Sequence, residues 1–228
     1  MPTKLITKFD SLKEWKNYCF DTHSLYLTNQ HFKKWIIRKE IVILNLSSLR
    51  NQTIQHIKQG VENAIKLGKL HFKIYDNSGD NYYKVINIKD ENIRSDKLLK
   101  MVVKIRKKSH KEQANIFILN KPINSPNGII KDGEALTYVS EGVIMFTFDT
   151  HKKYPYKFLM RRAKHETLHL LGLNFHHEDT KIEGYDNSIL CNMNYNAPTQ
   201  YLCKKCRDAL LSFWKGIEYA TKQKLIKG

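Results

Sequence analysis

The chain has 228 residues, with 39 Lys and Arg against 22 Asp and Glu, so its formal net charge is +17. Domains average roughly 150 residues, so this length fits one compact unit. Hydrophobic residues make up 41% of the chain and aromatic residues 11%, which is enough for a packed core and argues against disorder. No apolar run approaches the roughly 20 residues of a membrane helix, and no apolar signal core follows Met1. We therefore expect a cytoplasmic protein with no membrane span.

The positive charge permits a polyanion such as nucleic acid as a weak partner but does not identify one. Lysines are spread along nearly the whole chain, with short basic clusters at 106–108 and 161–164. No nucleic-acid-binding motif accompanies them, so a solvated surface explains most of this charge.

The first half of the chain alternates predicted helices and strands. Short helices are expected at 11–20 and 30–37, strands at 40–46, 70–75, 82–88 and 116–119, and amphipathic helices at 54–68 and from Ser95 or Asp96 to about 105. The segment 121–133 is rich in Pro, Asn and Gly, which predicts a surface loop.

The second half contains two apolar runs, 135–139 and 143–148, which predict a hairpin or a bent edge strand. A long helix is expected from about Pro155 to Leu171, followed by an irregular segment at 173–202 and a final helix at 204–225. Alternating strands and helices favour an α/β fold built on one sheet.

The sharpest motif is His165-Glu166-Thr167-Leu168-His169, an HExxH sequence on the predicted long helix. Residues four apart lie one turn above each other, so both imidazoles can bind the same Zn²⁺. Glu166 lies one step around the helix, where it can reach a water on that metal without being a ligand.

Gly172 follows His169 by three residues, where a glycine can end a helix in a left-handed conformation. The chain can then turn back, and His176 and His177 stand where a third ligand is needed. Three histidines and one open position form a catalytic zinc arrangement.

A second cluster consists of Cys191, Cys203 and Cys206, the last two in a CxxC motif at the start of the final helix. Three thiolates need a fourth ligand to complete a structural zinc site, and the second histidine of the 176–177 pair is the nearest candidate. The simplest division gives His176 to the catalytic zinc and His177 to the structural zinc, but the reverse assignment stays open. Cys19 stands apart and is expected in the core.

These residues resemble the archaemetzincins, within the metzincin zinc metalloproteases, whose pattern is HExxHxxGxxHC, then CxM, then CxxC. His165, Glu166, His169 and Gly172 are in register, and Cys191-Asn192-Met193 and Cys203–Cys206 match the later motifs. The third histidine comes one residue late, and His177 stands where the family has its first cysteine. Spacings between the later motifs also differ. The second departure predicts a His-Cys₃ structural site, and the likeness covers residues 165–206 alone.

The resemblance implies a metzincin-like α/β fold with a mixed twisted sheet and an active-site helix. The segment 1–39 would pack on the catalytic domain, 40–172 would form its upper part, and 173–228 would form a small loop-rich lower part held by zinc. The resemblance also implies that Met193 forms the Met-turn beneath the zinc ligands and that Tyr195 stabilises the oxyanion. The strand within 135–148 would line the cleft and pair with an extended substrate.

The sequence therefore predicts a zinc-dependent metallopeptidase that acts on peptide or protein substrates and holds two zinc ions, one catalytic and one structural. In this hypothesis Glu166 is the general base that activates the zinc-bound water. One alternative is a DNA-associated HExxH protease of the SprT type, although the third histidine lies farther from the motif in those proteins. The other alternative is a zinc-stabilised binding module without turnover.

Overall fold

The computed structural model describes residues 40–47, 49–68, 70–76, 93–109, 113–173, 176, 190–194 and 197–222. Within these ranges the chain is a mixed α/β protein with four helices, Asn51–Leu67 (α3), Ser95–Ser109 (α4), Tyr156–Leu170 (α5) and Lys204–Lys222 (α6). Its strands are Glu40–Asn45 (β1), Lys73–Asp76 (β2), Ile93–Arg94 (β3), Gln113–Leu119 (β4), Ile123–Ser125 (β5), Gly128–Ile130 (β6), Ala135–Tyr138 (β7) and Val143–Thr147 (β8). The helices expected at 11–20 and 30–37, the strand expected at 82–88 and Cys19 lie outside the described residues.

The main sheet has five strands in the order β2-β1-β4-β8-β7. The first four are parallel, and β7 runs antiparallel to β8, so the sheet is mixed. The hairpin expected from the two apolar runs is confirmed. Because the four parallel strands need crossover connections, helices cover both faces of the sheet.

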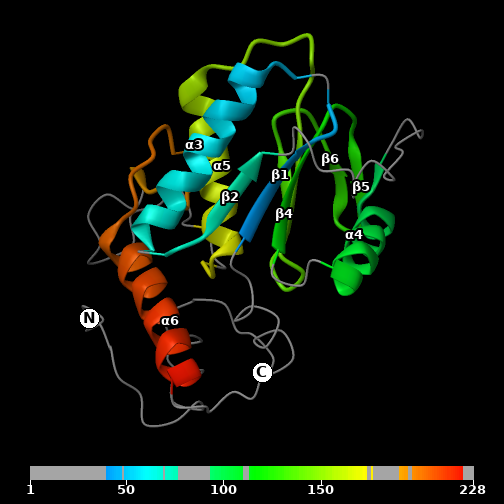
Figure 1. Cartoon of the computed structure of the whole chain (residues 1–228). Helices are drawn as coiled ribbons and strands as arrows, with labels where there is room; N and C mark the ends of the chain where they lie inside the picture. Colours follow the sequence, from blue (N-terminus) through cyan, green and yellow to red (C-terminus); the bar gives the residue numbers. More distant parts are fainter. Residues whose placement is uncertain are drawn as a thin grey trace.

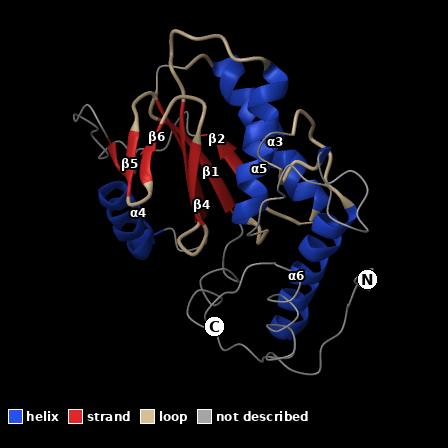
Figure 2. Cartoon of the chain, turned by 180° about the vertical axis from the view of Figure 1, so that it is seen from behind, coloured by secondary structure: helices blue, strands red, loops and turns tan. Residues whose placement is uncertain are grey.

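Both faces of the sheet are packed, as the alternation of side chains along β1 shows. Ile41 and Ile43 join one buried cluster, and Val42 and Leu44 join the other. Helices α3 and α5 cover the first face and α4 covers the second (Figure 1). The view from behind shows the same division, with α6 below α5 (Figure 2).

Two predictions about the sheet and its loops are wrong. The segment 121–133 contains β5 and β6, which pair antiparallel and form a second, three-stranded sheet with β3. Each of these strands is three residues or fewer, and β6 begins with Gly128, which has a φ of 124°. The Pro, Asn and Gly residues of the turn therefore predict a loop even though two short strands flank that turn. The described part of the chain therefore has two sheets rather than one. The strand expected at 70–75 begins at Lys73 and ends at Asp76.

The final helix packs against the end of α5. Gly172 has a φ of 116°, which confirms the left-handed turn predicted after α5. A Cβ at that position would lie 2.9 Å from the Phe213 ring of α6. Trp214 on α6 donates a hydrogen bond from Nε1 to the carbonyl of Leu171 over 2.8 Å. In the described part of the chain, none of the helices has the length and hydrophobicity needed to cross a membrane.

Candidate metal centre

Helix α5 presents His165 and His169 on the same face, as the four-residue spacing predicts. Their ring centroids are 4.8 Å apart, and the two side chains are 3% and 9% exposed. Leu159, Ala163 and Leu168 hold the helix against the sheet because they belong to the buried cluster on that face. The HExxH segment is therefore a fixed, buried part of the fold.

The third histidine to reach this face is His176, after the turn at Gly172. The Nε2 atoms of His165, His169 and His176 form a triangle with sides of 3.0, 3.1 and 3.2 Å. Tetrahedral zinc, with Zn–N distances of about 2.0–2.1 Å, places two ligand nitrogens about 3.3 Å apart. We call these three residues the histidine cluster. Its geometry fits one zinc ion, and His176 is its exposed member.

Hydrogen bonds to backbone carbonyls orient two of the three rings. His165 Nδ1 lies 2.5 Å from the carbonyl oxygen of Asn192, and His169 Nδ1 lies 2.6 Å from that of Leu173. Because a carbonyl only accepts hydrogen bonds, each Nδ1 carries the proton and each Nε2 presents a lone pair. Lone pairs facing one another at this distance repel unless a cation lies between them, so the cluster has the chemistry of a metal site.

Burial, together with the nearby His169, lowers the pKa of His165 to about 3. In the unfolded chain a histidine titrates near 6.5. Between these two values the unfolded chain binds a proton that the folded chain does not, so acid favours unfolding.

We expect the metal-free protein to lose stability as the pH falls below about 6.5, with no contribution from His165 above that pH. The loss from this residue approaches about 1.4 kcal/mol per pH unit. Urea unfolding at a series of pH values measures how the free energy of unfolding depends on pH. We expect this slope to decrease in His165→Gln. His151→Gln removes an exposed histidine and should keep the wild-type slope. An equal slope in wild type and His165→Gln would contradict this prediction.

Glu166 is 6% exposed, and its Oε2 accepts a hydrogen bond from the hydroxyl of Thr137 over 2.7 Å. Thr137 lies on β7, the edge strand of the main sheet. This bond fixes one oxygen of the carboxylate and leaves the other as a proton acceptor. The base candidate is therefore tied to the strand that borders the site.

Cys191, Cys203 and Cys206 form the cysteine cluster, in which all three side chains are at most 1% exposed. Their sulfur atoms lie within 4.8 Å of one another, and the sulfurs of Cys191 and Cys206 are 3.7 Å apart. None of the three is in a disulfide. Zinc–sulfur distances of about 2.3 Å would place tetrahedral sulfur ligands about 3.8 Å apart, so this cluster also fits a metal.

Hydrogen bonding to Cys191 and Cys203, together with burial, raises the pKa of the Cys206 thiol well above its usual value. A metal ion at this cluster must displace those protons to obtain thiolate ligands. Burial also lowers the pKa of the nearby Lys164 to about 8. The predicted fourth ligand, His177, lies outside the described residues.

Residues 190–194 connect the two clusters. Cys191 belongs to the cysteine cluster, the carbonyl of Asn192 accepts the hydrogen bond from Nδ1 of His165, and Met193 is fully buried in the main core. Asn194 closes the turn by donating from its backbone N–H to the carbonyl of Cys191 over 2.8 Å. Tyr195 lies outside the described residues, so its predicted role stays a prediction.

Sequence reasoning missed three of the groups that shape the centre, the hydroxyl of Thr137 and the carbonyls of Leu173 and Asn192. Threonine is common in strands, and every residue has a carbonyl, so no sequence signal singles them out. The sequence indicated only that Thr137 is a polar residue within a predicted hairpin or edge strand.

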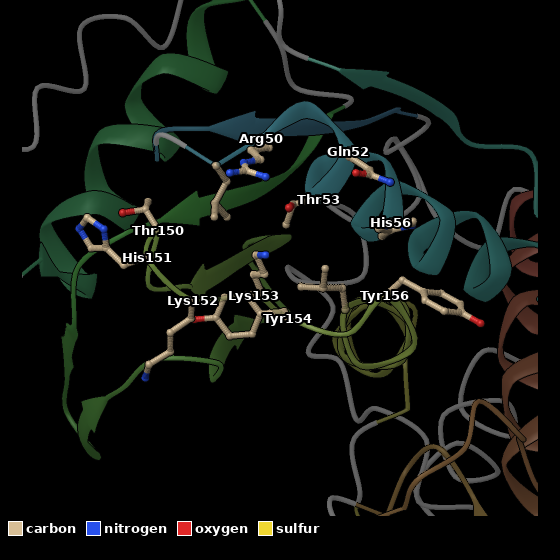
Figure 3. A pocket seen from close by; sticks show the side chains of 12 residues that line it. Arg50, Gln52, Thr53, His56, Thr150, His151, Lys152, Lys153, Tyr154 and Tyr156 are labelled. Carbon is tan, nitrogen blue, oxygen red and sulfur yellow. The ribbon is translucent and has the colours of Figure 1, made fainter.

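A cavity of about 440 Å³ lies apart from both clusters, where the segments that enter α3 and α5 meet. Arg50 and Thr53 line it from the start of α3, and Lys153 and Tyr156 line it from the start of α5 (Figure 3). None of the predicted site residues contributes to its wall. The histidine cluster and the cysteine cluster remain the candidate functional site.

Comparisons with known proteins find no match to this chain among protein-family models, curated proteins or solved structures. Its function is therefore argued from its own residues and their geometry.

Proposed function

We propose that this chain is a zinc-dependent metallopeptidase of the archaemetzincin type. The observation that carries the proposal is the convergence of three imidazole nitrogens, 3.0–3.2 Å apart, beside the glutamate of an HExxH helix. His176 supports this assignment over an SprT-type protease, because it reaches the same point only seven residues after His169. Zinc bound there would supply a Lewis acid and lower the pKa of water toward neutrality.

The residues of the chain would bind the metal, transfer the proton and orient the base. His165 and His169 are held by backbone carbonyls, so their lone pairs need little reorganisation on binding metal. Glu166 takes a proton from the attacking water and delivers it to the departing amine, so each turnover returns the carboxylate to its starting state. Thr137 holds that carboxylate in one orientation.

The edge strand β7 supplies a place for the substrate. Among the described strands it pairs only with β8, and the proposal places main-chain hydrogen bonds to the substrate along its other edge. An extended peptide paired there would run past Thr137, whose hydroxyl reaches Glu166. Recognition through the main chain would make the enzyme tolerant of many side chains.

The cysteine cluster serves as the second, structural zinc site of this proposal, with His177 as the fourth ligand. Closing a site with four protein ligands leaves no position for water, which separates its role from that of the histidine cluster. Met193 would form the hydrophobic base beneath the histidines, and Tyr195 would stabilise the oxyanion.

The proposal is tested by assaying the zinc-loaded chain on a mixture of fluorogenic peptides. We expect hydrolysis that is lost on incubation with a chelator and restored by adding Zn²⁺. Zinc content is measured in each sample, so that loss of metal and loss of activity can be compared directly.

Two other results would replace this proposal. A protein that holds two zinc ions but hydrolyses no peptide would be the zinc-stabilised binding module. Hydrolysis that requires DNA and falls steeply with added salt would identify the DNA-associated protease, because phosphate contacts are weakened by salt.

A further inference from the structure

We propose that the cysteine cluster and the histidine cluster bind their metals cooperatively. Metal at the cysteines would fix the two backbone carbonyls that orient His165 and His169, so each bound ion would raise the affinity for the other. This inference goes beyond the proposed function, because it requires two metal sites but does not depend on peptidase activity.

The first connection runs through the turn at 191–194. The carbonyl that accepts the hydrogen bond from Nδ1 of His165 belongs to Asn192, the residue directly after the candidate metal ligand Cys191. The backbone N–H of Asn192 donates to the carbonyl of Tyr201 over 2.5 Å, and Tyr201 lies two residues before Cys203. The positioning carbonyl is therefore placed between two of the three cysteines.

The second connection runs through α6, whose first turn contains Cys206. Further along this helix, Phe213 lies against Gly172, and Trp214 donates a hydrogen bond to the carbonyl of Leu171. These contacts support the turn that ends in Leu173, whose carbonyl orients His169. Fixing the start of α6 therefore supports the second positioning carbonyl as well.

Metal binding at the cysteines would strengthen the connection between the 191–194 turn and α6. With protonated thiols, the link from Cys191 to Cys206 is a weak sulfur contact at 3.7 Å. Metal–thiolate bonds would convert that contact into a crosslink between the 191–194 turn and α6. Partners outside the metal shell typically change metal affinity by about 10- to 100-fold, which is the size of coupling we expect.

Contacts that need no metal also hold residues 192 and 197 against α5, and they offer an alternative explanation for the position of the Asn192 carbonyl. Arg161 on α5 donates to the carbonyl of Ala197 over 2.6 Å, and the side chain of Asn192 donates to the carbonyl of Arg161 over 3.3 Å. If these contacts alone fixed the Asn192 carbonyl, filling the cysteine cluster would not change zinc affinity at the histidines. A direct measurement separates the two cases.

The first experiment compares zinc affinity at the histidine cluster with the cysteine cluster filled or disabled. Wild-type protein is first loaded with one equivalent of Cd²⁺, which prefers thiolates. Zinc affinity is then measured by competition with a chromophoric chelator. We expect the double variant Cys203→Ser and Cys206→Ser to bind zinc about 10- to 100-fold more weakly than this protein. Circular dichroism establishes that the variant is folded.

The reciprocal experiment keeps the cysteines intact, so the test stands even if the serine variant fails to fold. Linkage requires that an empty histidine cluster weaken Cd²⁺ binding at the cysteines by the same factor. His176→Ala disables the histidine cluster at its exposed member, and His151→Ala is the matched control on an exposed loop. Cadmium retention against a chelator is followed by sulfur-to-cadmium absorption, with one equivalent of zinc present.

Equal weakening in both experiments, with wild-type behaviour of His151→Ala, is the expected result. Unchanged affinity in either experiment would overturn the proposed coupling. Absence of the sulfur-to-cadmium absorption in wild-type protein would also overturn it, because the cysteines would then not bind the metal.

Discussion

Replacing Glu166 with glutamine should lower kcat by about 10²- to 10⁴-fold while zinc content and fold are retained. Glutamine has nearly the same shape, and its carbonyl oxygen can still accept the hydrogen bond that Thr137 donates to Glu166. It cannot accept a proton from water, so the variant loses the general base and little else. Steady-state kinetics at saturating peptide, with zinc measured on the same samples, gives the result.

A matched control removes a carboxylate elsewhere. Glu62→Gln changes the net charge by the same amount on α3, at a residue that belongs to neither cluster, and should leave kcat unchanged. If Glu166→Gln kept a kcat within a few-fold of the wild type, another group would have to act as the base and the mechanism would be wrong. Glu166→Ala should give the same loss of activity, with an additional effect from the missing contact to Thr137.

The parts of the site that the sequence predicted are those fixed by local geometry. His165 and His169 meet because their spacing matches one helical turn, and that holds wherever the helix packs. His176 reaches them because Gly172 reverses the chain within a few residues. Over so short a distance the possible paths of the backbone are few, so residue type and spacing predict a third histidine here, although they left His176 and His177 as alternatives.

The parts that the sequence did not predict depend on contacts between distant segments. Thr137 reaches Glu166 across 29 positions, and the carbonyl of Asn192 reaches His165 across 27. Neither partner carries a distinctive residue type. The second sheet was missed for a different reason, because β5 and β6 are three residues each and too short to show a period.

For a substitution in the middle of α3, helix propensity and the structure predict opposite changes in stability. Glycine in a helix interior is less favourable than alanine by about 1 kcal/mol, so propensity alone predicts that Gly60→Ala stabilises the protein. In the structure α3 and α5 meet at this position. A Cβ on Gly60 would lie 2.3 Å from the carbonyl oxygen of Met160 and 2.8 Å from the Cβ of Ala163.

We therefore expect Gly60→Ala to lower the free energy of unfolding by about 3 kcal/mol, at the upper end of overpacking effects. The nearest obstacle is a backbone atom, so a side-chain rotation cannot relieve the overlap and α5 must move with the histidines that it carries. Urea unfolding of the metal-loaded protein measures the change, and Gln59→Ala, at an exposed position of the same helix, should stay within about 0.5 kcal/mol of wild type. A Gly60→Ala protein as stable as the wild type would show that α3 and α5 are not in this close contact, and the buried placement of the HExxH helix would then have to be revised.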